Sequence, residues 1–283
     1  MAFVDLHTHT IYSDGIDDPM TLVIAAKLKG IDALAITDHD IMDGYLGAIA
    51  EAEKWGLRLI PGVEVSTEKY HILGLNVDPG DKKFQRFLKL VRSYQKETAG
   101  KRIEVLQDLG VPITMEKLEM AFPESRLGRY NVFMTMVMDK ECREYFRKQN
   151  GGVSPDEIYT MFFRKNERVK NVERKDVKPE EAIRQIHEAG GIAVIAHPFK
   201  NIDNIMEMDA LVEAGLDGVE MQPKHFHGED YLEYAKKKEL MITYGSDYHG
   251  ASHDRPLLGI GHNYIEWDRL EDMLNRYSGA KIC

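Results

Sequence analysis

The sequence predicts an α/β fold, a parallel (β/α) barrel interrupted by one helical insertion. Short β-branched runs alternate with amphipathic helical segments over residues 1–78 and again from residue 179 onward. This alternation is typical of βαβ units and a parallel sheet. Between the two stretches, apolar side chains recur at helical spacing and no strand alternation interrupts them. We therefore expect a barrel domain formed by residues 1–78 and 179–283, with a helical insertion over residues 79–178.

The first part of the expected barrel contains four strands. β-branched and apolar runs indicate the strands, and proline in a first helical turn indicates a helix start. The expected order is a strand at Phe3–Leu6, a helix at Pro19–Lys29, a strand at Ala33–Thr37, a helix at Asp43–Trp55, and strands at Arg58–Val63 and Tyr70–Asn76. The turn sequence Asp78-Pro79-Gly80 ends this part of the barrel.

The insertion and the second part of the barrel follow. The helical pattern over residues 81–178 is broken at Gly110–Pro112, Phe122–Pro123 and Gly151–Gly152. The barrel resumes with a helix that begins at Pro179 and ends at Gly190-Gly191. The remaining expected elements are strands at Ile192–Ala196, Asp217–Met221, Leu240–Tyr244 and Leu257–Ile260, and a helix at Glu266–Tyr277. Seven or eight strands with connecting helices are the number that closes a barrel of this kind.

The composition is that of an ordinary globular protein. Of its 283 residues, 43% are hydrophobic and 30% are charged, which excludes disordered, collagen-like and coiled-coil classes. The longest apolar runs, such as Ile192–Ala196, are far shorter than the roughly 18 residues of a membrane span. Two cysteines, Cys142 and Cys283, make no disulfide framework. We expect a cytoplasmic protein without membrane contact and without an obligate protein partner.

The charge is distributed unevenly along the chain. Residues 79–178 carry 22 Lys and Arg against 15 Asp and Glu, whereas the remainder carries 15 basic against 32 acidic residues. An acidic surface repels phosphate groups unless cations intervene. The basic insertion and bound metal ions could both reverse this repulsion. The alternative, a solvated face of ordinary helices, stays open for the insertion.

Polar residues cluster at the ends of the expected strands, where parallel α/β folds place their active sites. His7 and His9 follow the first strand, and because side chains alternate along a strand they point to the same side, ~7 Å apart. Alone, this pair fits a metal site or a structural pair equally well. The full set of candidate metal ligands is His7, His9, Asp14, His39, Glu64, His71, His197, Asp247 and His249.

Nine candidate ligands are more than one ion can use, because an ion that keeps a water molecule needs three to five. Two or three divalent ions are therefore expected, with Glu64 and Asp247 as bridging carboxylates. Mixed imidazole and carboxylate ligands suit Zn, Mn or Fe. Neighbouring ions can activate a bridging hydroxide as nucleophile for an in-line displacement at phosphorus. Hydrolysis of a phosphate ester is the chemistry that this pattern favours.

Seven motifs in order along the chain resemble the PHP (polymerase and histidinol phosphatase) family. The motifs are Asp5-Leu6-His7-Thr8-His9 with Ser13-Asp14-Gly15, Thr37-Asp38-His39, Pro61-Gly62-Val63-Glu64, His71-Ile72-Leu73-Gly74, Ala196-His197-Pro198 and Gly245-Ser246-Asp247-Tyr248-His249. The resemblance implies a distorted (β/α)7 barrel and three metal positions. Carried over residue by residue, the first position is held by His7, His9, Glu64 and Asp247, the second by Glu64, His71 and His197, and the third by Asp14, His39 and His249.

The helical insertion resembles the subgroup of stand-alone PHP phosphoesterases that act on nucleotides and short oligonucleotides, in which it caps the substrate. Members carry a Gly-Arg-x-His element, which here reads Gly128-Arg129-Tyr130-Asn131. Arg129 is thus a candidate catalytic residue and bidentate phosphate ligand. Asn131 replaces a histidine and cannot donate a proton near pH 7. Lys200 and Arg255 are further candidate substrate contacts, or else solvated surface charges, and His249 and Asp247 are candidate catalytic groups.

The predicted function is a metal-dependent phosphoesterase acting on a nucleotide or the end of a short oligonucleotide. Two other enzyme classes remain as alternatives, a small-molecule phosphatase of the histidinol-phosphate type and an amidohydrolase-like C–N hydrolase. A non-catalytic binding module is disfavoured, because none of the nine ligand positions lacks a suitable residue.

Overall fold

The computed structural model describes residues 2–123, 125–150, 153–200, 202, 204–221, 228–250, 264–265, 270–272 and 275. The chain divides into two compact units, one formed by Met1–Val91 with Val177–Cys283 and the other by Arg92–Asp176. We call them the barrel unit and the helical unit. No helix within the described ranges combines the length and the apolar character that crossing a membrane requires.

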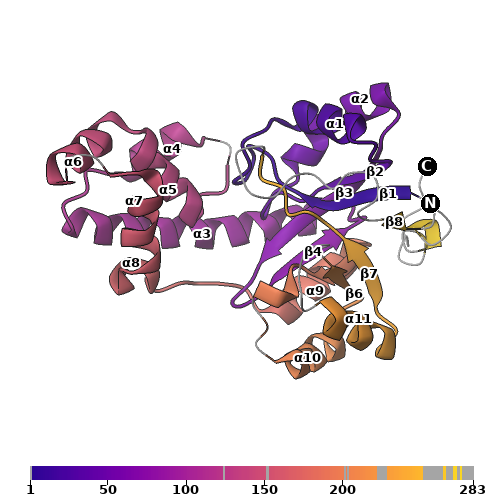
Figure 1. Ribbon diagram of the computed structural model, residues 1–283. Helices are drawn as coiled ribbons and strands as arrows, with labels where there is room; N and C mark the ends of the chain where they lie inside the picture. The colour runs from indigo at the N-terminus through magenta and orange to yellow at the C-terminus, as the bar shows by residue number, and fades with distance from the viewer. Residues whose placement is uncertain are drawn as a thin grey trace. The chain divides into compact units, whose positions relative to one another are not determined.

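The barrel unit contains one sheet whose strands follow one another around a nearly closed barrel (Figure 1). The sheet order is β7-β6-β5-β4-β3-β2-β1-β8. After β7 the chain returns to β1, where Thr8 forms a parallel bridge with Tyr248. The fold is therefore the predicted distorted (β/α)7 barrel. The strands are β1 (Ala2–Thr8), β2 (Ala33–Ile36), β3 (Arg58–Ser66), β4 (His71–Leu75), β5 (Ile192–Ile195), β6 (Gly218–Met221), β7 (Met241–Tyr244) and β8 (Tyr264–Ile265).

The expectation of an all-parallel barrel is wrong at β4, which runs antiparallel to both β3 and β5. Only residues 67–70 separate β3 from β4, too few for the crossover that parallel neighbours need. Ser66, at the end of β3, consequently pairs with His71 at the start of β4. The first residue of β4 thus lies at the same edge as the last residue of β3.

The C-terminal elements are only partly described. The expected strand Leu257–Ile260 lies outside the described residues. Instead, Tyr264–Ile265 form β8, which pairs antiparallel with the start of β1. Within the expected helix Glu266–Tyr277, residues 270–272 and 275 are helical.

Helices pack around the barrel as the amphipathic pattern predicts. Asp18 caps the helix that begins at Pro19, because its carboxylate accepts from the backbone N–H groups of Met20 and Thr21. The helix that begins at Asp43 ends at Gly56, whose φ of 58° is a left-handed conformation that glycine adopts at little cost. Figure 1 shows these two helices side by side. The helices of the barrel unit are α1 (Pro19–Leu28), α2 (Asp43–Trp55), α9 (Pro179–Glu188), α10 (Met208–Glu213) and α11 (Gly228–Lys237).

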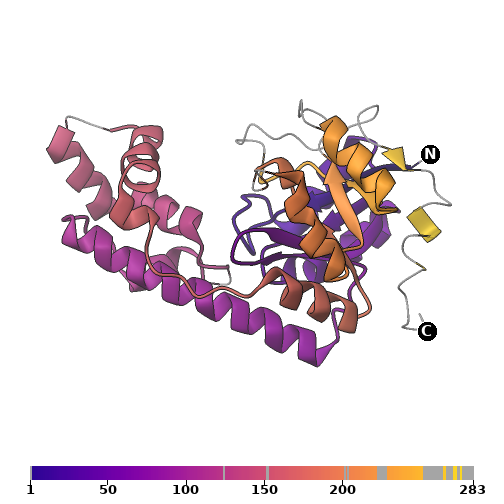
Figure 2. The same ribbon diagram turned by 90° about the horizontal axis from the view of Figure 1, so that it is seen from below.

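The helical unit has its own apolar core. Phe133, Phe146 and Phe163 are buried at its centre together with Leu106 and Cys142. Helix α3 (Lys82–Asp108) is continuous and begins in the barrel unit (Figure 2). The remaining elements are α4 (Met115–Ala121), α5 (Arg129–Met138), α6 (Lys140–Asn150), α7 (Pro155–Tyr159), a π-helical turn at Thr160–Arg164 and α8 (Glu167–Lys170).

The helical unit begins at Arg92 rather than at the expected residue 79. The first turns of α3 belong to the barrel unit, where Lys83 pairs with Glu188 of α9 and the amide of Gln85 contacts the sulfur of Met42. A helical period in the sequence shows where a helix lies but not which core each of its turns joins, so the unit boundary falls inside α3.

Candidate metal centre

Nine buried or half-buried side chains meet at the end of the barrel where β1, β2, β5 and β7 finish. His7 and His9 come from β1 and its extension, and both are completely buried. Glu64 lies inside β3, which continues three residues beyond the strand end expected from sequence. The antiparallel direction of β4 brings His71 to the same edge. The others, which lie in the loops after β1, β2, β5 and β7, are Asp14, His39, His197, Asp247 and His249.

The donor atoms of these residues lie close enough to share metal ions. They form four overlapping groups, within each of which all donor atoms lie within 4.8 Å of one another. Each of the nine candidate ligands belongs to at least one group. The groups are His9, Asp14, His39 and His249; His7, His197 and Asp247; His7, His9 and Glu64; and His39, Glu64 and His71.

Glu64 is at the centre of the cluster. Its Oε2 atom lies 3.2 Å from Nε2 of His7, from Nε2 of His9 and from Nδ1 of His39. Within the described part of the chain this buried oxygen nevertheless accepts no hydrogen bond. The other oxygen, Oε1, lies 2.9 and 3.0 Å from two further imidazole nitrogens, those of His71 and His197. A buried carboxylate oxygen that faces three nitrogens without hydrogen bonding is suited to a cation, so the residues present fit a metal centre.

The pKa shifts in the metal-free cluster also fit a metal centre. Burial would raise the pKa of Glu64, but His39, His7 and His71 outweigh burial and hold that pKa well below its usual value. Burial would likewise lower the pKa of His9, yet Asp247 and Glu64 raise it to about 9. Without a cation, the buried carboxylates are therefore balanced by protons on imidazole rings. Divalent ions can supply the same positive charge and displace those protons.

Two further carboxylates support the cluster, and the sequence interpretation missed both. Glu220 of β6 lies 2.7 Å through Oε1 from Nδ1 of His7, and its Oε2 accepts from the backbone N–H of His197 at 2.6 Å. Asp5 accepts from the backbone N–H of Ser246 at 2.9 Å and from its hydroxyl at 2.7 Å. Both lie inside predicted strands of the barrel. A carboxylate in such a strand needs a buried partner, and that was the available signal.

Asp38 and Asp40, on either side of His39, are both buried and form local hydrogen bonds. Asp38 accepts from the backbone N–H and the hydroxyl of Thr10 at 2.7 and 2.6 Å, and from the hydroxyl of Ser13 at 2.6 Å. Asp40 accepts from the backbone N–H of Ser66 at 2.7 Å. Burial nevertheless raises the pKa of Asp38, although His9 and these hydrogen bonds oppose it. Both carboxylates brace the segments that carry Asp14 and His39.

The expected substrate contacts fall in different places. Lys200 is paired with Asp247 through its ammonium group, so it is not a solvated surface charge. Asn131 is almost fully buried at the start of α5, where its carbonyl oxygen accepts from the backbone N–H of Gly128 at 3.0 Å. The role seen for Asn131 is therefore that of a helix cap. Arg129 is exposed at the first residue of the same helix. Arg255 lies outside the described residues.

Positive charge is concentrated around Arg102 in the helical unit. This arginine is only 5% exposed, and its Nε donates to the carbonyl of Val169 at 3.3 Å. Burial and then the neighbouring guanidinium groups of Arg129, Arg174 and Arg126 lower the pKa of Arg102 to about 10. Buried arginines are usually paired with acids. The group therefore gathers guanidinium charge around a desolvated arginine, although Arg174 is itself paired with Asp176 at 2.9 Å.

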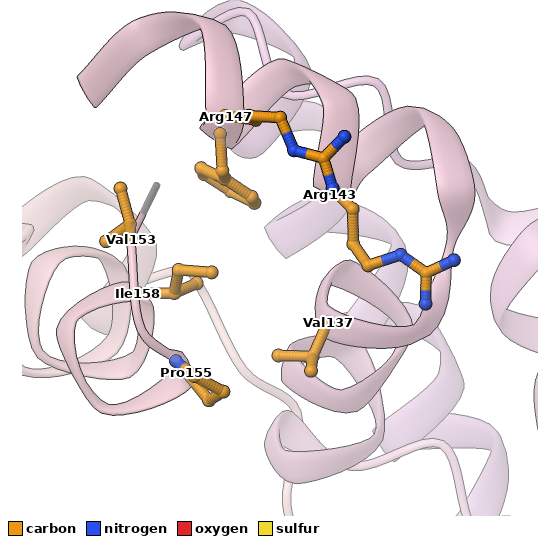
Figure 3. A pocket seen from close by; sticks show the side chains of 7 residues that line it. Val137, Arg143, Arg147, Val153, Pro155 and Ile158 are labelled. Atoms are coloured by element: carbon orange, nitrogen blue, oxygen red, sulfur yellow. The ribbon is translucent and has the colours of Figure 1, made fainter. Parts of the chain in front are cut away.

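A separate pocket of about 250 Å³ lies within the helical unit (Figure 3). Figure 3 shows Arg143 and Arg147 along one edge and Val153, Pro155 and Ile158 on the other. No acidic group pairs with either guanidinium in the ranges that the structure describes. The complete lining is Val137, Arg143, Phe146, Arg147, Val153, Pro155 and Ile158.

Comparison with known proteins identifies the family. The model of the PHP domain matches residues 5–149, about half of the chain. The chain belongs to the PHP domain family. A 5'-3' exoribonuclease of Haemophilus influenzae is 30% identical over 259 residues, which cover 87% of this chain and 89% of that protein. A phosphoribosyl 1,2-cyclic phosphate 1,2-diphosphodiesterase of Eggerthella lenta is 28% identical, covering 90% of this chain and 97% of its own.

A solved structure supports the assignment to the PHP family. The crystal structure of a candidate metal-dependent phosphoesterase from Bifidobacterium adolescentis superposes with a TM-score of 0.79 at 26% identity, covering 97% of this chain and 96% of the other. The PHP fold, the cluster of imidazole and carboxylate groups and these relatives agree. This PHP protein is a metal-dependent phosphoesterase.

Proposed function

We propose that this PHP protein hydrolyses phosphate esters of nucleotides or of the ends of short oligonucleotides. The observation that carries the substrate class is the arginine group around Arg102, which lies in the helical unit and not among the metal-ligand candidates. Guanidinium groups bind phosphate, and a nucleotide bisphosphate or an oligonucleotide carries more than one phosphate.

The nine clustered side chains would hold two or three divalent ions, and their mixture of imidazole and carboxylate suits Zn, Mn or Fe. Bound ions of this kind activate a water molecule as nucleophile and neutralise the charge that develops on the phosphoryl oxygens. Glu64 and Asp247 would bridge neighbouring positions, because each lies close to several imidazole nitrogens.

His249 acts as a ligand rather than as a proton donor in this proposal. Its Nδ1 lies 2.8 Å from the backbone carbonyl of Asp247 and therefore carries the hydrogen. In the neutral ring Nε2 then has the lone pair, and this atom lies 3.3 Å from Asp14. A nitrogen with a lone pair can bind an ion but has no proton for a leaving group.

The helical unit supplies substrate specificity in this proposal. Arg129, which is exposed beside buried Arg102, is a candidate for binding a substrate phosphate. The pocket edged by Arg143 and Arg147 combines two cations with an apolar floor, which suits a base and its phosphate in a longer strand. Asn131 takes no part in proton transfer, because its amide caps α5.

A substrate panel tests the proposal. The Mn-loaded protein would be assayed with a mononucleotide, a 3',5'-bisphosphate nucleotide, a short 5'-phosphorylated RNA, histidinol phosphate and a bis-aryl phosphodiester. The proposal predicts the highest kcat/KM for the bisphosphate nucleotide or the RNA. A preference for histidinol phosphate would keep the metal chemistry and overturn the nucleotide assignment.

A further inference from the structure

Glu220 connects two of the proposed metal ligands from outside the ligand set. Its side chain is 1% exposed, and its two oxygens contact different segments of the barrel. One oxygen lies 2.7 Å from Nδ1 of His7 on β1, and the other accepts from the backbone N–H of His197, after β5, at 2.6 Å. A single carboxylate on β6 therefore fixes parts of two other segments.

The contact with His7 decides which ring nitrogen faces the cluster. A carboxylate accepts hydrogen bonds, so Nδ1 of His7 carries a hydrogen, and in the neutral ring that binds a metal Nε2 has the lone pair. This Nε2 lies 3.2 Å from Glu64 and 3.1 Å from Nε2 of His9. Carboxylates that hold a metal-binding histidine in this way orient the ring and increase its basicity.

The contact with His197 holds an unusual backbone. His197 has a φ of 31°, a value that residues other than glycine rarely adopt. Such a conformation persists only where its surroundings enforce it. The short hydrogen bond from its N–H to Glu220 is one such restraint, and Nε2 of His197 lies 3.0 Å from the other oxygen of Glu64.

Gly245 lies next to the carboxylate of Glu220, where a side chain would not fit. A Cβ atom on Gly245 would lie 2.3 Å from Oε1 of Glu220 and 2.3 Å from Cβ of His7. Any larger residue at this position would displace the pair. The glycine of the Gly245-Ser246-Asp247 segment is therefore explained by the contact between Glu220 and His7.

From these contacts we propose that Glu220 is a positioning residue of the metal centre, holding the ring of His7 and the backbone of His197 in the geometry that binds metal. The inference rests on the proposed metal ligands but not on the identity of the substrate. It concerns ion binding, which can be measured without turnover.

The chain offers a matched control for Glu220. Asp217, also on the β6 side of the barrel, lies 2.7 Å from Nε2 of His187 and accepts from the backbone N–H of Ala193 at 2.8 Å. Asp217 thus makes the same two kinds of contact as Glu220. It belongs to none of the metal-ligand groups, nor does His187.

The test compares Glu220→Gln with Asp217→Asn by titrating each metal-free protein with Mn²⁺ and measuring bound metal per chain. The amide of Glu220→Gln has one acceptor oxygen, so it can satisfy only one of the two donors. We expect its metal affinity to fall roughly 10- to 100-fold, with Asp217→Asn binding as wild type. Wild-type affinity in Glu220→Gln, or an equal loss in both variants, would overturn the inference.

A second variant covers the case in which Glu220→Gln does not fold. Glu220→Asp keeps the charge but is one methylene shorter, so it cannot reach both partners. We expect a smaller loss of affinity and an altered visible spectrum when Co²⁺ replaces Mn²⁺; an unchanged affinity and spectrum would again overturn the inference. The substrate panel is a separate test: failure of wild type to hydrolyse any ester would refute the proposed function while leaving the metal titration interpretable.

Discussion

The pKa of His9 predicts how the stability of the metal-free protein depends on pH. His9 is completely buried, and its pKa is raised from 6.5 to about 9: burial opposes this, but Asp247 and Glu64 prevail. A raised folded-state pKa contributes stability that is fully present below pH 6.5 and is lost as pH rises through about 9. At 1.36 kcal/mol per pKa unit, the contribution is about 3 kcal/mol.

For a chain of this size, that contribution corresponds to a fall of roughly 5–10 °C in Tm. The assay is thermal unfolding of chelator-treated protein between pH 6 and 9.5, with His9→Gln as the control that removes the titrating ring. We expect a clearly shallower pH slope in His9→Gln. Mn-loaded wild type should not lose stability over this range, because a metal-bound imidazole is already neutral. A metal-free Tm that is flat or rises with pH would refute the reasoning.

Three further predictions concern activity. Asp247→Ala should abolish hydrolysis while changing the far-UV circular dichroism little, because it removes a proposed bridging ligand at the end of the barrel; wild-type rates would sink the ligand assignment. Arg129→Ala should raise KM for phosphate-bearing nucleotides by about tenfold but leave an aryl phosphate unchanged, and equal effects on both substrates would remove Arg129 from substrate recognition. The double variant Arg143→Ala/Arg147→Ala should weaken binding of a short RNA several-fold and spare a mononucleotide, whereas the exposed control Arg86→Ala should affect neither. Unchanged RNA affinity would exclude the pocket as a strand contact.

The order of strands and helices could be predicted because periodicity and turn residues are local. The helix at Asp43–Trp55 and the strand from Ile192 appear where the pattern places them. Strand direction is not local information. The antiparallel β4 was missed, although the short segment 67–70 before it is too brief for a parallel crossover.

The clustering of the candidate metal ligands could be predicted, because residue types that bind metals occur at the strand ends where barrel folds place their active sites. Histidines and carboxylates at the ends of several barrel strands are typical of a metal site, and the structure brings all nine together. Glu220 and Asp5 could not be assigned to this site, because their partners, His7 and Ser246, lie more than 200 residues away along the chain.

Single polar residues were harder to interpret. Asn131 aligns with a family motif, but the cap that it forms depends on the backbone of Gly128. For Lys200 the sequence left a surface charge and a substrate contact open, and the fold pairs it with Asp247, which excludes only the solvated surface charge. In both cases the hydrogen-bond or ion-pair partner depends on three-dimensional packing, which the spacing of residues in the sequence does not predict.

The most direct test of the metal-dependent mechanism is a reconstitution titration. Chelator-treated wild type would receive Mn²⁺ in increments while phosphate release from a 3',5'-bisphosphate nucleotide and bound metal per chain are followed together. We expect no release without metal and a rise in activity that saturates at two or three ions per chain. Full activity in metal-free protein, or saturation without any gain in activity, would contradict this mechanism.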